Sequence, residues 1–302
     1  MKNQYLLLSV TLLLSHFPCF SQYYFYNDQY YDKPVIIELG ASIGGMNCLT
    51  DLGGKNGTGK KFIKDLNLKN TRIGYGIYLN ALYNQAIGLR LEAVWGEVTA
   101  SDSVLKNDKG AGSSRYRRNL HFRSTIAEYS LLAELHFLQL INQHTYSCSP
   151  YFLGGIGVFH FNPEARLNNI WMPLNPLHTE GQGFKEFPGK NPYKLTQLNF
   201  PLGLGIRYEI SAIVCARMEL LYRFLSTDYL DDVSTSYISP VHFYNNLDAE
   251  TAFLSKSLAD RKAELEPGVY ALPGEKRGNP LNKDAYFTLT VRLGIILNRS
   301  KK

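Results

Sequence analysis

Hydrophobic residues recur at every second position in eight separate segments of this 302-residue chain. In residues 71–83, apolar side chains such as Ile73 and Ile77 alternate with Gly74 and Gly76. Successive side chains of a β-strand point to opposite faces of the sheet. A hydrophobic residue at every second position therefore predicts a strand with one apolar face. The fifth segment is apolar at both parities, which leaves its facing open. The predicted strands are 35–49, 71–83, 87–98, 125–140, 150–161, 195–209, 212–225 and 285–298.

The connections between these segments alternate in length. Three links are short (84–86, 141–149 and 210–211), and the four between them are long (50–70, 99–124, 162–194 and 226–284). Each segment also exceeds the roughly 9–11 residues that a tilted strand needs to cross a bilayer. Long strands with short turns at one rim and long loops at the other are typical of outer-membrane barrels. We therefore predict an all-β fold, an eight-stranded antiparallel transmembrane β-barrel with short periplasmic turns and long outer loops. An even strand number places both termini in the periplasm.

The first residues, MKNQYLLLSVTLLLSHFPCFSQ, have one early charge, a short apolar stretch and a less apolar end. This is the plan of a secretory signal peptide, because the apolar part is too short for a membrane-spanning helix. We assign residues 1–22 to the signal and residues 23–302 to the barrel, located in the outer membrane of a Gram-negative cell. Membrane lipid is then an obligatory partner.

The polar parity of the strands carries charges of both signs. In a barrel of eight strands the interior is just wide enough to be filled by side chains. We therefore interpret the charges as a paired structural network, with room for long arginines left by inward glycines, and predict no catalytic residue. His136 and His160 are expected to hydrogen-bond in the same interior. The predicted charged residues are Glu38, Glu92, Glu128, Glu134 and Glu219 with Arg72, Arg90, Arg207, Arg217, Arg223 and Arg292.

Composition narrows the function classes. Lys and Arg number 32 against 26 Asp and Glu, an excess too small and too scattered to indicate a nucleic-acid partner. Beyond the predicted signal, the cysteines are Cys48, Cys148 and Cys215. An odd count argues against a dense disulfide framework. We expect three separate thiols packed as small apolar side chains, while one bridge remains an alternative.

Two loops have distinct character. In residues 226–284, Asp248 is a plausible N-cap for a helix with a Leu254, Leu258 and Leu265 stripe, which Pro267-Gly268 would end. The loop 102–124 is basic, with Arg115, Arg117, Arg118 and Arg123. Guanidinium groups bind phosphate well, so we expect contact with anionic lipid head groups, or alternatively with a protein partner.

Candidate cofactor and metal motifs are weak. GKNGTGKK (54–61) resembles a phosphate-binding loop, but Lys61 stands where the motif requires Ser or Thr. Asp228, Asp231 and Asp232 lack the regular spacing of a calcium loop, and we favour ion pairs with loop arginines. We predict no cofactor, no metal and no small-molecule substrate.

Several segments together are similar to one family. They are LGASIGGMNCLTDL (39–52), YRRNLHFRS (116–124), PYFLGGIGVFHFNPEA (150–165) and RMELLYRFLSTDYLDDVSTSYI (217–238), and the likeness extends over essentially the whole mature chain. The chain resembles the PorG-like outer-membrane barrels associated with the type IX secretion system. That resemblance implies a non-enzymatic barrel that contacts a periplasmic secretion-ring lipoprotein and, through it, the ring.

The main functional hypothesis is therefore an anchor for this ring. Its docking surface would comprise the short turns, the aromatic segment 23–34 and the C-terminal NRSKK, although segment 23–34 also suits a membrane-interface anchor. An alternative is a surface adhesin or generic structural barrel that acts through its long outer loops. An enzyme with its site at the rim is a third hypothesis, without a supporting residue pattern.

Overall fold

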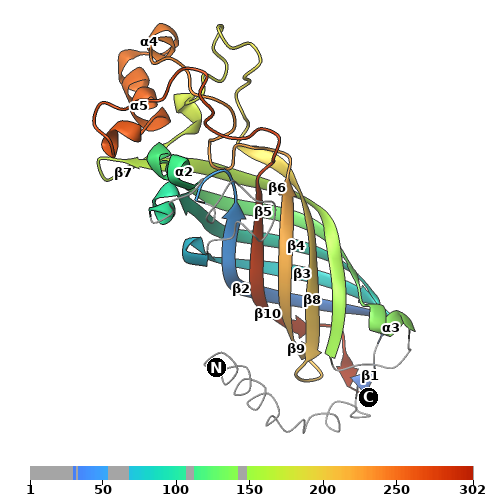
Figure 1. The fold of residues 1–302 in the computed structure, drawn as a ribbon. Helices are drawn as coiled ribbons and strands as arrows, with labels where there is room; N and C mark the ends of the chain where they lie inside the picture. Colours follow the sequence, from blue (N-terminus) through green and yellow to red (C-terminus); the bar gives the residue numbers. More distant parts are fainter. Residues whose placement is uncertain (1–29, 32, 54–67, 107–111, 142–147, 302) are drawn as a thin grey trace, which may run out of the picture.

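The computed structural model describes residues 30–31, 33–53, 68–106, 112–141 and 148–301. Each long strand is antiparallel to the next in sequence, and the last pairs with the first (Figure 1). The chain is a closed eight-stranded antiparallel β-barrel, which confirms the predicted fold class. The barrel strands are β2 (Val35–Leu49), β3 (Arg72–Tyr83), β4 (Ile87–Ser101), β5 (His121–Leu135), β6 (Cys148–Leu167), β8 (Thr196–Glu209), β9 (Val214–Leu225) and β10 (Ala285–Ile296).

The two rims differ as the link lengths predict. At the short-turn rim, Asn84 and Gln85 both have positive φ, and the Ala86 N–H donates to the Tyr83 carbonyl at 2.9 Å. These are the features of a two-residue hairpin turn whose twist matches its strands. The same rim carries the small β1–β11 pair (Tyr30–Tyr31 with Ser300–Lys301). The opposite rim carries the long connections.

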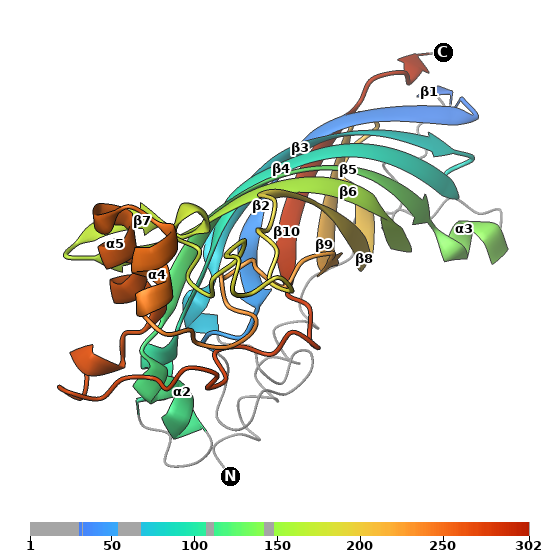
Figure 2. The ribbon, with the colours of Figure 1, turned by 90° about the horizontal axis from the view of Figure 1, so that it is seen from above.

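The long connections form a compact layer over one end of the barrel (Figures 1 and 2). We call residues 102–120, 168–195 and 226–284, where described, the loop cap. None of the described helices is long and apolar enough to cross a membrane. Besides β7 (Ile170–Pro173), the elements outside the barrel wall are η2 (Leu68–Asn70), η3 (Asp102–Leu105), α2 (Gly112–Arg118), α3 (Phe137–Ile141), η4 (Asn175–Leu177), α4 (Val241–Asn246), α5 (Ala249–Ala259) and η5 (Lys262–Glu264).

The fourth strand lies earlier in the chain than its pattern predicts. It occupies His121–Leu135, and the predicted residues 137–140 belong to helix α3 at the short-turn rim. The helix is held there by an aromatic contact, since the Phe137 and Phe152 ring centroids lie 5.5 Å apart. The apolar alternation in the sequence therefore extends beyond Leu135, where the strand ends at the rim.

The structure shows which side chains of β6 point into the barrel, a point that the sequence left open. Its inward side chains include Tyr151, Leu153 and Phe159, and its outward ones include Phe152 and Val158. His160 lies on the outward parity and is exposed, so the prediction of an interior His160 is wrong. Beyond the barrel wall, the end of β6 pairs with β7 and carries the hairpin into the loop cap.

The outward face of the barrel is an apolar belt. Large aliphatic side chains point outward from all eight strands, with aromatic rings such as Tyr75 and Tyr83 toward opposite rims. So large an exposed apolar surface would be unstable in water, whereas a bilayer satisfies it, and aromatic girdles suit the two interfaces. Representative exposed residues are Leu39, Ile77, Leu79, Leu91, Leu131, Ile156, Leu204 and Leu293.

A charge in the belt tests this placement. Leu91 is 57% exposed and lies in register between Leu79 and Leu131. We expect Leu91→Arg to lower the free energy of unfolding by about 2–4 kcal/mol, because the guanidinium would lie in hydrocarbon. Denaturant unfolding from lipid vesicles measures the change. The control is Leu281→Arg in the loop cap, where the leucine is 89% exposed; an equal loss there would contradict a lipid-facing belt.

Candidate functional site

The barrel interior is filled by side chains that neutralise one another. Ten charged residues at the predicted positions are buried, each with an exposed fraction of 3% or less. Arg217 binds Glu38 at 2.7 and 2.8 Å and Glu134 at 2.9 Å. The buried residues are Glu38, Glu92, Glu128, Glu134 and Glu219 with Arg90, Arg207, Arg217, Arg223 and Arg292.

The network joins strands on opposite sides of the barrel. Arg90 on β4 binds both carboxylate oxygens of Glu219 on β9, at 2.9 and 2.6 Å. Arg292 on β10 binds Glu92 on β4 at 2.7 and 2.9 Å. Two-point guanidinium–carboxylate contacts fix both groups in orientation as well as distance. The arrangement satisfies buried charge and leaves these carboxylates bound to arginines, so the interior is a structural core.

Tyrosine rings complete this core. The Tyr78 hydroxyl donates to Glu38 at 2.5 Å, and the Tyr151 hydroxyl donates to Glu219. The inward glycines make room for these rings: a Cβ at Gly40 would overlap Tyr78, and one at Gly205 would overlap Tyr151. The sequence predicts inward glycines that make room for arginines; at Gly40 and Gly205 the neighbouring side chains are tyrosines instead.

One predicted interior charge lies elsewhere. Arg72, at the outer end of β3, has a side chain 53% exposed and faces Glu97 at 3.7 Å. It keeps the inward parity, but β3 begins at this residue, where the strand meets the rim. His136 is interior as predicted, with Nδ1 2.9 Å from the Ser149 hydroxyl.

Breaking the network should be costly. Arg217→Met leaves Glu38 and Glu134 buried with fewer counter-charges, and we expect the free energy of unfolding to fall by about 3–5 kcal/mol. Arg72→Met removes an exposed pair and should cost about 0–1 kcal/mol. Guanidinium unfolding of both variants in the same lipid vesicles compares them; similar losses would show that interior pairing does not stabilise the barrel.

The loop cap has its own arginine core. Arg118 on α2 binds Asp102 through Nε at 2.8 Å and donates to the Asp51 carbonyl at 2.8 Å. It also donates to the carbonyl of Arg277 at 2.6 Å, and Arg277 binds Glu180 at 3.1 Å. Two buried guanidiniums therefore connect four of the chain's long connections.

These contacts change the interpretation of the basic loop. Arg117 pairs with Glu266 at 3.2 Å, and Arg123 pairs with Glu164 at 2.7 Å while lying over the Trp171 ring. Together with Arg118, these arginines bind groups of the protein itself and stabilise the cap. Contact of the loop with lipid head groups stays a prediction.

Helix α5 begins where the sequence predicts. Asp248 caps it by accepting from the backbone N–H groups of Glu250 and Thr251. The helix ends at Ala259, before Leu265, because Asp260 turns its carboxylate to the N–H groups of Lys262 and Ala271 at 3.1 and 2.7 Å. Its buried face packs Leu258 against Ala165, Leu174 and Leu177.

The acidic cluster divides into two kinds of residue. Asp232 lies 3.6 Å from the Arg277 guanidinium and accepts from Tyr193 at 2.7 Å, which confirms ion pairing for this residue. For Asp228 and Asp231 the prediction is wrong: Asp228 accepts from Ser234, and Asp231 from the N–H groups of Leu52 and Val233. Within the described residues, no three His, Cys, Asp or Glu side chains are arranged to hold a metal.

Burial raises the pKa of these unpaired carboxyls. The pKa of Asp228 rises to about 8, first because of burial and then because Asp51 and Glu180 lie near it. Burial likewise raises the pKa of Asp51, Asp231 and Asp284, and the neighbouring carboxyls add to the effect. A carboxyl with a raised folded-state pKa stabilises the fold at low pH, and this contribution is lost as pH rises.

The loop cap should consequently loosen as pH rises from about 4 toward about 8. We expect faster proteolytic cleavage of the cap at the upper end of this range, and Asp228→Asn should reduce the difference because the amide stays neutral. Asp248→Asn is the control, since hydrogen bonds from the helix N-terminus lower the pKa of Asp248. A cleavage rate independent of pH, or equal effects of both variants, would contradict this.

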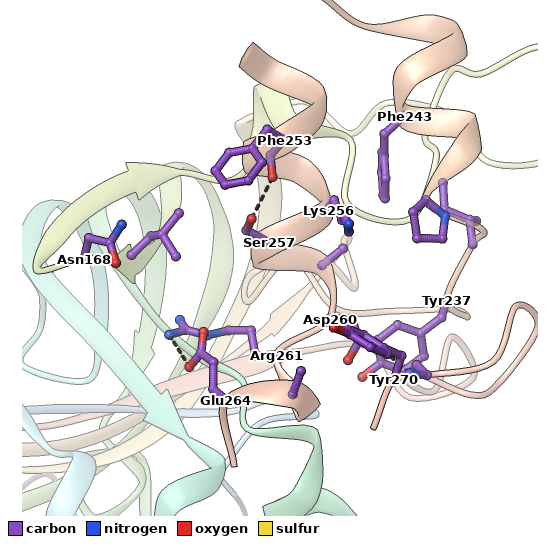
Figure 3. Close-up of a pocket in the computed structure, with 16 residues that line it drawn as sticks. Asn168, Tyr237, Phe243, Phe253, Lys256, Ser257, Asp260, Arg261, Glu264 and Tyr270 are labelled. Atoms are coloured by element: carbon purple, nitrogen blue, oxygen red, sulfur yellow. Dashed lines mark hydrogen bonds and ion pairs between the residues drawn. The ribbon is translucent and has the colours of Figure 1, made fainter. Parts of the chain in front are cut away.

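A pocket of about 440 Å³ lies at the end of α5 (Figure 3). Its walls are mostly apolar and aromatic, including Phe243, Phe253, Tyr237 and Tyr270, with Lys256 among a few polar groups. Such a size and lining are typical of small-molecule sites. The sequence predicts α5 but not this pocket, because its walls join residues 167–168 to residues 237–271 and no local pattern records that contact.

The three cysteines among the described residues are free thiols. Cys48 and Cys215 are buried, as expected of small apolar side chains. Cys148 is exposed at the start of β6, so the expectation of a packed thiol is wrong for that residue. The phosphate-binding-like segment 54–61 and the signal at 1–22 lie outside the described residues.

No protein-family model matches this chain, and no curated protein matches it. Among solved structures, the N-terminal β-barrel domain of OprF from Pseudomonas aeruginosa is 10% identical, with 88% of this chain and 98% of that chain covered and a TM-score of 0.33. Neisserial surface protein A is 7% identical, with 88% of this chain and 98% of that chain covered and a TM-score of 0.37. OprG from Pseudomonas aeruginosa is 12% identical, with 87% of this chain and 95% of that chain covered and a TM-score of 0.38. At this level of similarity no family is assigned, and the fold rests on the chain's own strand pairing.

Proposed function

We propose that the protein is a non-enzymatic outer-membrane barrel that anchors the periplasmic ring of a type IX secretion machine. The apolar belt supports a membrane location, and the neutralised interior favours a structural rather than a catalytic or conducting barrel. The resemblance to PorG-like barrels supplies the partner, a periplasmic ring lipoprotein. The short-turn rim would face the periplasm, as the even strand number implies.

The observation that carries the proposal is the structure of this rim. Tyr30 and Tyr31 pair with Lys301 and Ser300 as a two-stranded ribbon, so both ends of the described chain meet there. The tail leading to the ribbon is fixed: Arg299 binds Glu209 at 3.1 Å, and Asn298 donates to the Val35 carbonyl at 2.6 Å. A ribbon with a free edge can pair with a strand of a partner protein.

Crosslinked capture tests the anchor. We expect tagged protein from solubilised membranes to recover a periplasmic ring lipoprotein, and deletion of residues 299–302 to reduce recovery at least about tenfold by removing β11. Mass spectrometry quantifies the partner. The matched control is Lys185→Met, an exposed lysine in the loop cap. Failure of the unaltered protein to capture any ring component, or full capture after the deletion, would rule out the anchor.

A second candidate function, surface binding through the loop cap, is favoured by the packing of that cap. Phe184, Ile238 and Phe243 form a buried cluster with Ala252 and Ala259 of α5, separate from the barrel core. The Tyr237 N–H donates to the Glu275 carbonyl at 2.9 Å, and the Gly274 N–H donates to the Tyr237 carbonyl at 2.9 Å, which closes the base of the segment between them. Replacing residues 239–272 with a short Gly-Ser link should therefore abolish surface binding and leave ring capture intact.

A further inference from the structure

The charged side chains that line the α5 pocket differ in their partners. Arg261 binds Glu264 at 2.9 Å, and Asp260 is held by two backbone N–H groups. The Lys256 side chain makes no hydrogen bond or ion pair within the part of the chain that the structure describes. It lies in the last turn of α5 and is exposed. Lys256 is therefore the charged side chain of this lining that has no partner among the described residues, while Asp260 keeps its negative charge and is held by backbone N–H groups.

Aromatic rings define the rest of the pocket. In Figure 3, Lys256 lies on the side of α5 that faces Phe243, and both residues line the cavity together with Tyr237 and Tyr270. Tyr270 is 63% exposed and Phe253 58% exposed, so their rings are accessible at the pocket. Tyr237 is only 4% exposed, and its hydroxyl has no hydrogen-bond partner among the described residues. A buried unpaired hydroxyl is unfavourable and would gain from an acceptor.

We propose that this pocket binds an aromatic carboxylate. The ring would pack against the aromatic walls and the carboxylate would pair with Lys256, because offset or edge contacts between rings and a charge-assisted hydrogen bond are the interactions this lining offers. The volume suits one or two fused rings. The proposal deepens the surface-binding candidate by naming a ligand class, and it is independent of the secretion-ring anchor.

The test uses the full-length mature protein in lipid nanodiscs, with 2-naphthoate as the probe. Saturation-transfer NMR and calorimetry compare it with the neutral 2-naphthalenemethanol, and empty nanodiscs correct for partition into lipid. We expect naphthoate to bind more tightly than the alcohol. Lys256→Met, which keeps an unbranched apolar side chain, should weaken naphthoate about tenfold and abolish its preference over the alcohol. Lys256→Arg should preserve that preference.

Two further variants separate pocket binding from general effects. Tyr270→Ala should weaken both probes, because it removes an accessible ring without removing the charge. Lys185→Met, an exposed lysine that does not line the pocket, should change neither. A peptide ending in phenylalanine, free or amidated, shows whether the same chemistry is accepted from a chain terminus. Binding to empty nanodiscs only, equal affinity for acid and alcohol, or unchanged affinity in Lys256→Met would overturn the proposal; ring capture would be unaffected.

Discussion

The pairing of arginine with carboxylate inside a narrow barrel is the constraint on which this structure depends. Eight strands enclose too little space for bulk water, so inward charges must find partners on other strands. Arg90 reaches from β4 to Glu219 on β9, and Arg292 reaches from β10 to Glu92 on β4. Each contact fixes the relative register of distant strands, because a slip by one residue would turn the charge outward.

The loop cap uses the same solution outside the membrane. Arg118 and Arg277 are buried and bind carboxylates and backbone carbonyls from several connections. Long loops would ordinarily be mobile, since each ordered residue loses conformational entropy. Here buried charged groups and small apolar clusters hold the loops in one conformation. The barrel therefore supports a surface of defined shape.

Much of the barrel could be predicted because its environment imposes a period of two. Outward side chains face lipid and inward side chains form charged pairs, so apolar and polar residues alternate along each strand. This alternation allowed all eight strands and ten of the eleven interior charges to be predicted. The exceptions have local causes. Arg72 lies at the rim, His160 lies in a run that is apolar on both parities, and residues 137–141 continue an alternation in a helix.

The candidate sites were less predictable for a physical reason. The α5 pocket and the Arg277 contacts bring together residues from loops far apart in sequence, and no local pattern records such pairings. Asp248 was predictable because capping is a local interaction between neighbours. By contrast, the partners of Asp231 are backbone groups of a different loop and of its own turn, which no charge pattern indicates.

The segment between Tyr237 and Glu275 begins and ends at the same place, because these two residues are hydrogen-bonded and Ser236 also bridges to Lys276. Its length and content are therefore uncoupled from the strand register below it. During evolution, such a segment can be lengthened, shortened or exchanged while the membrane-embedded wall stays the same. The fold thus separates the part of the protein that must suit the bilayer from a part outside the bilayer that is free to diversify.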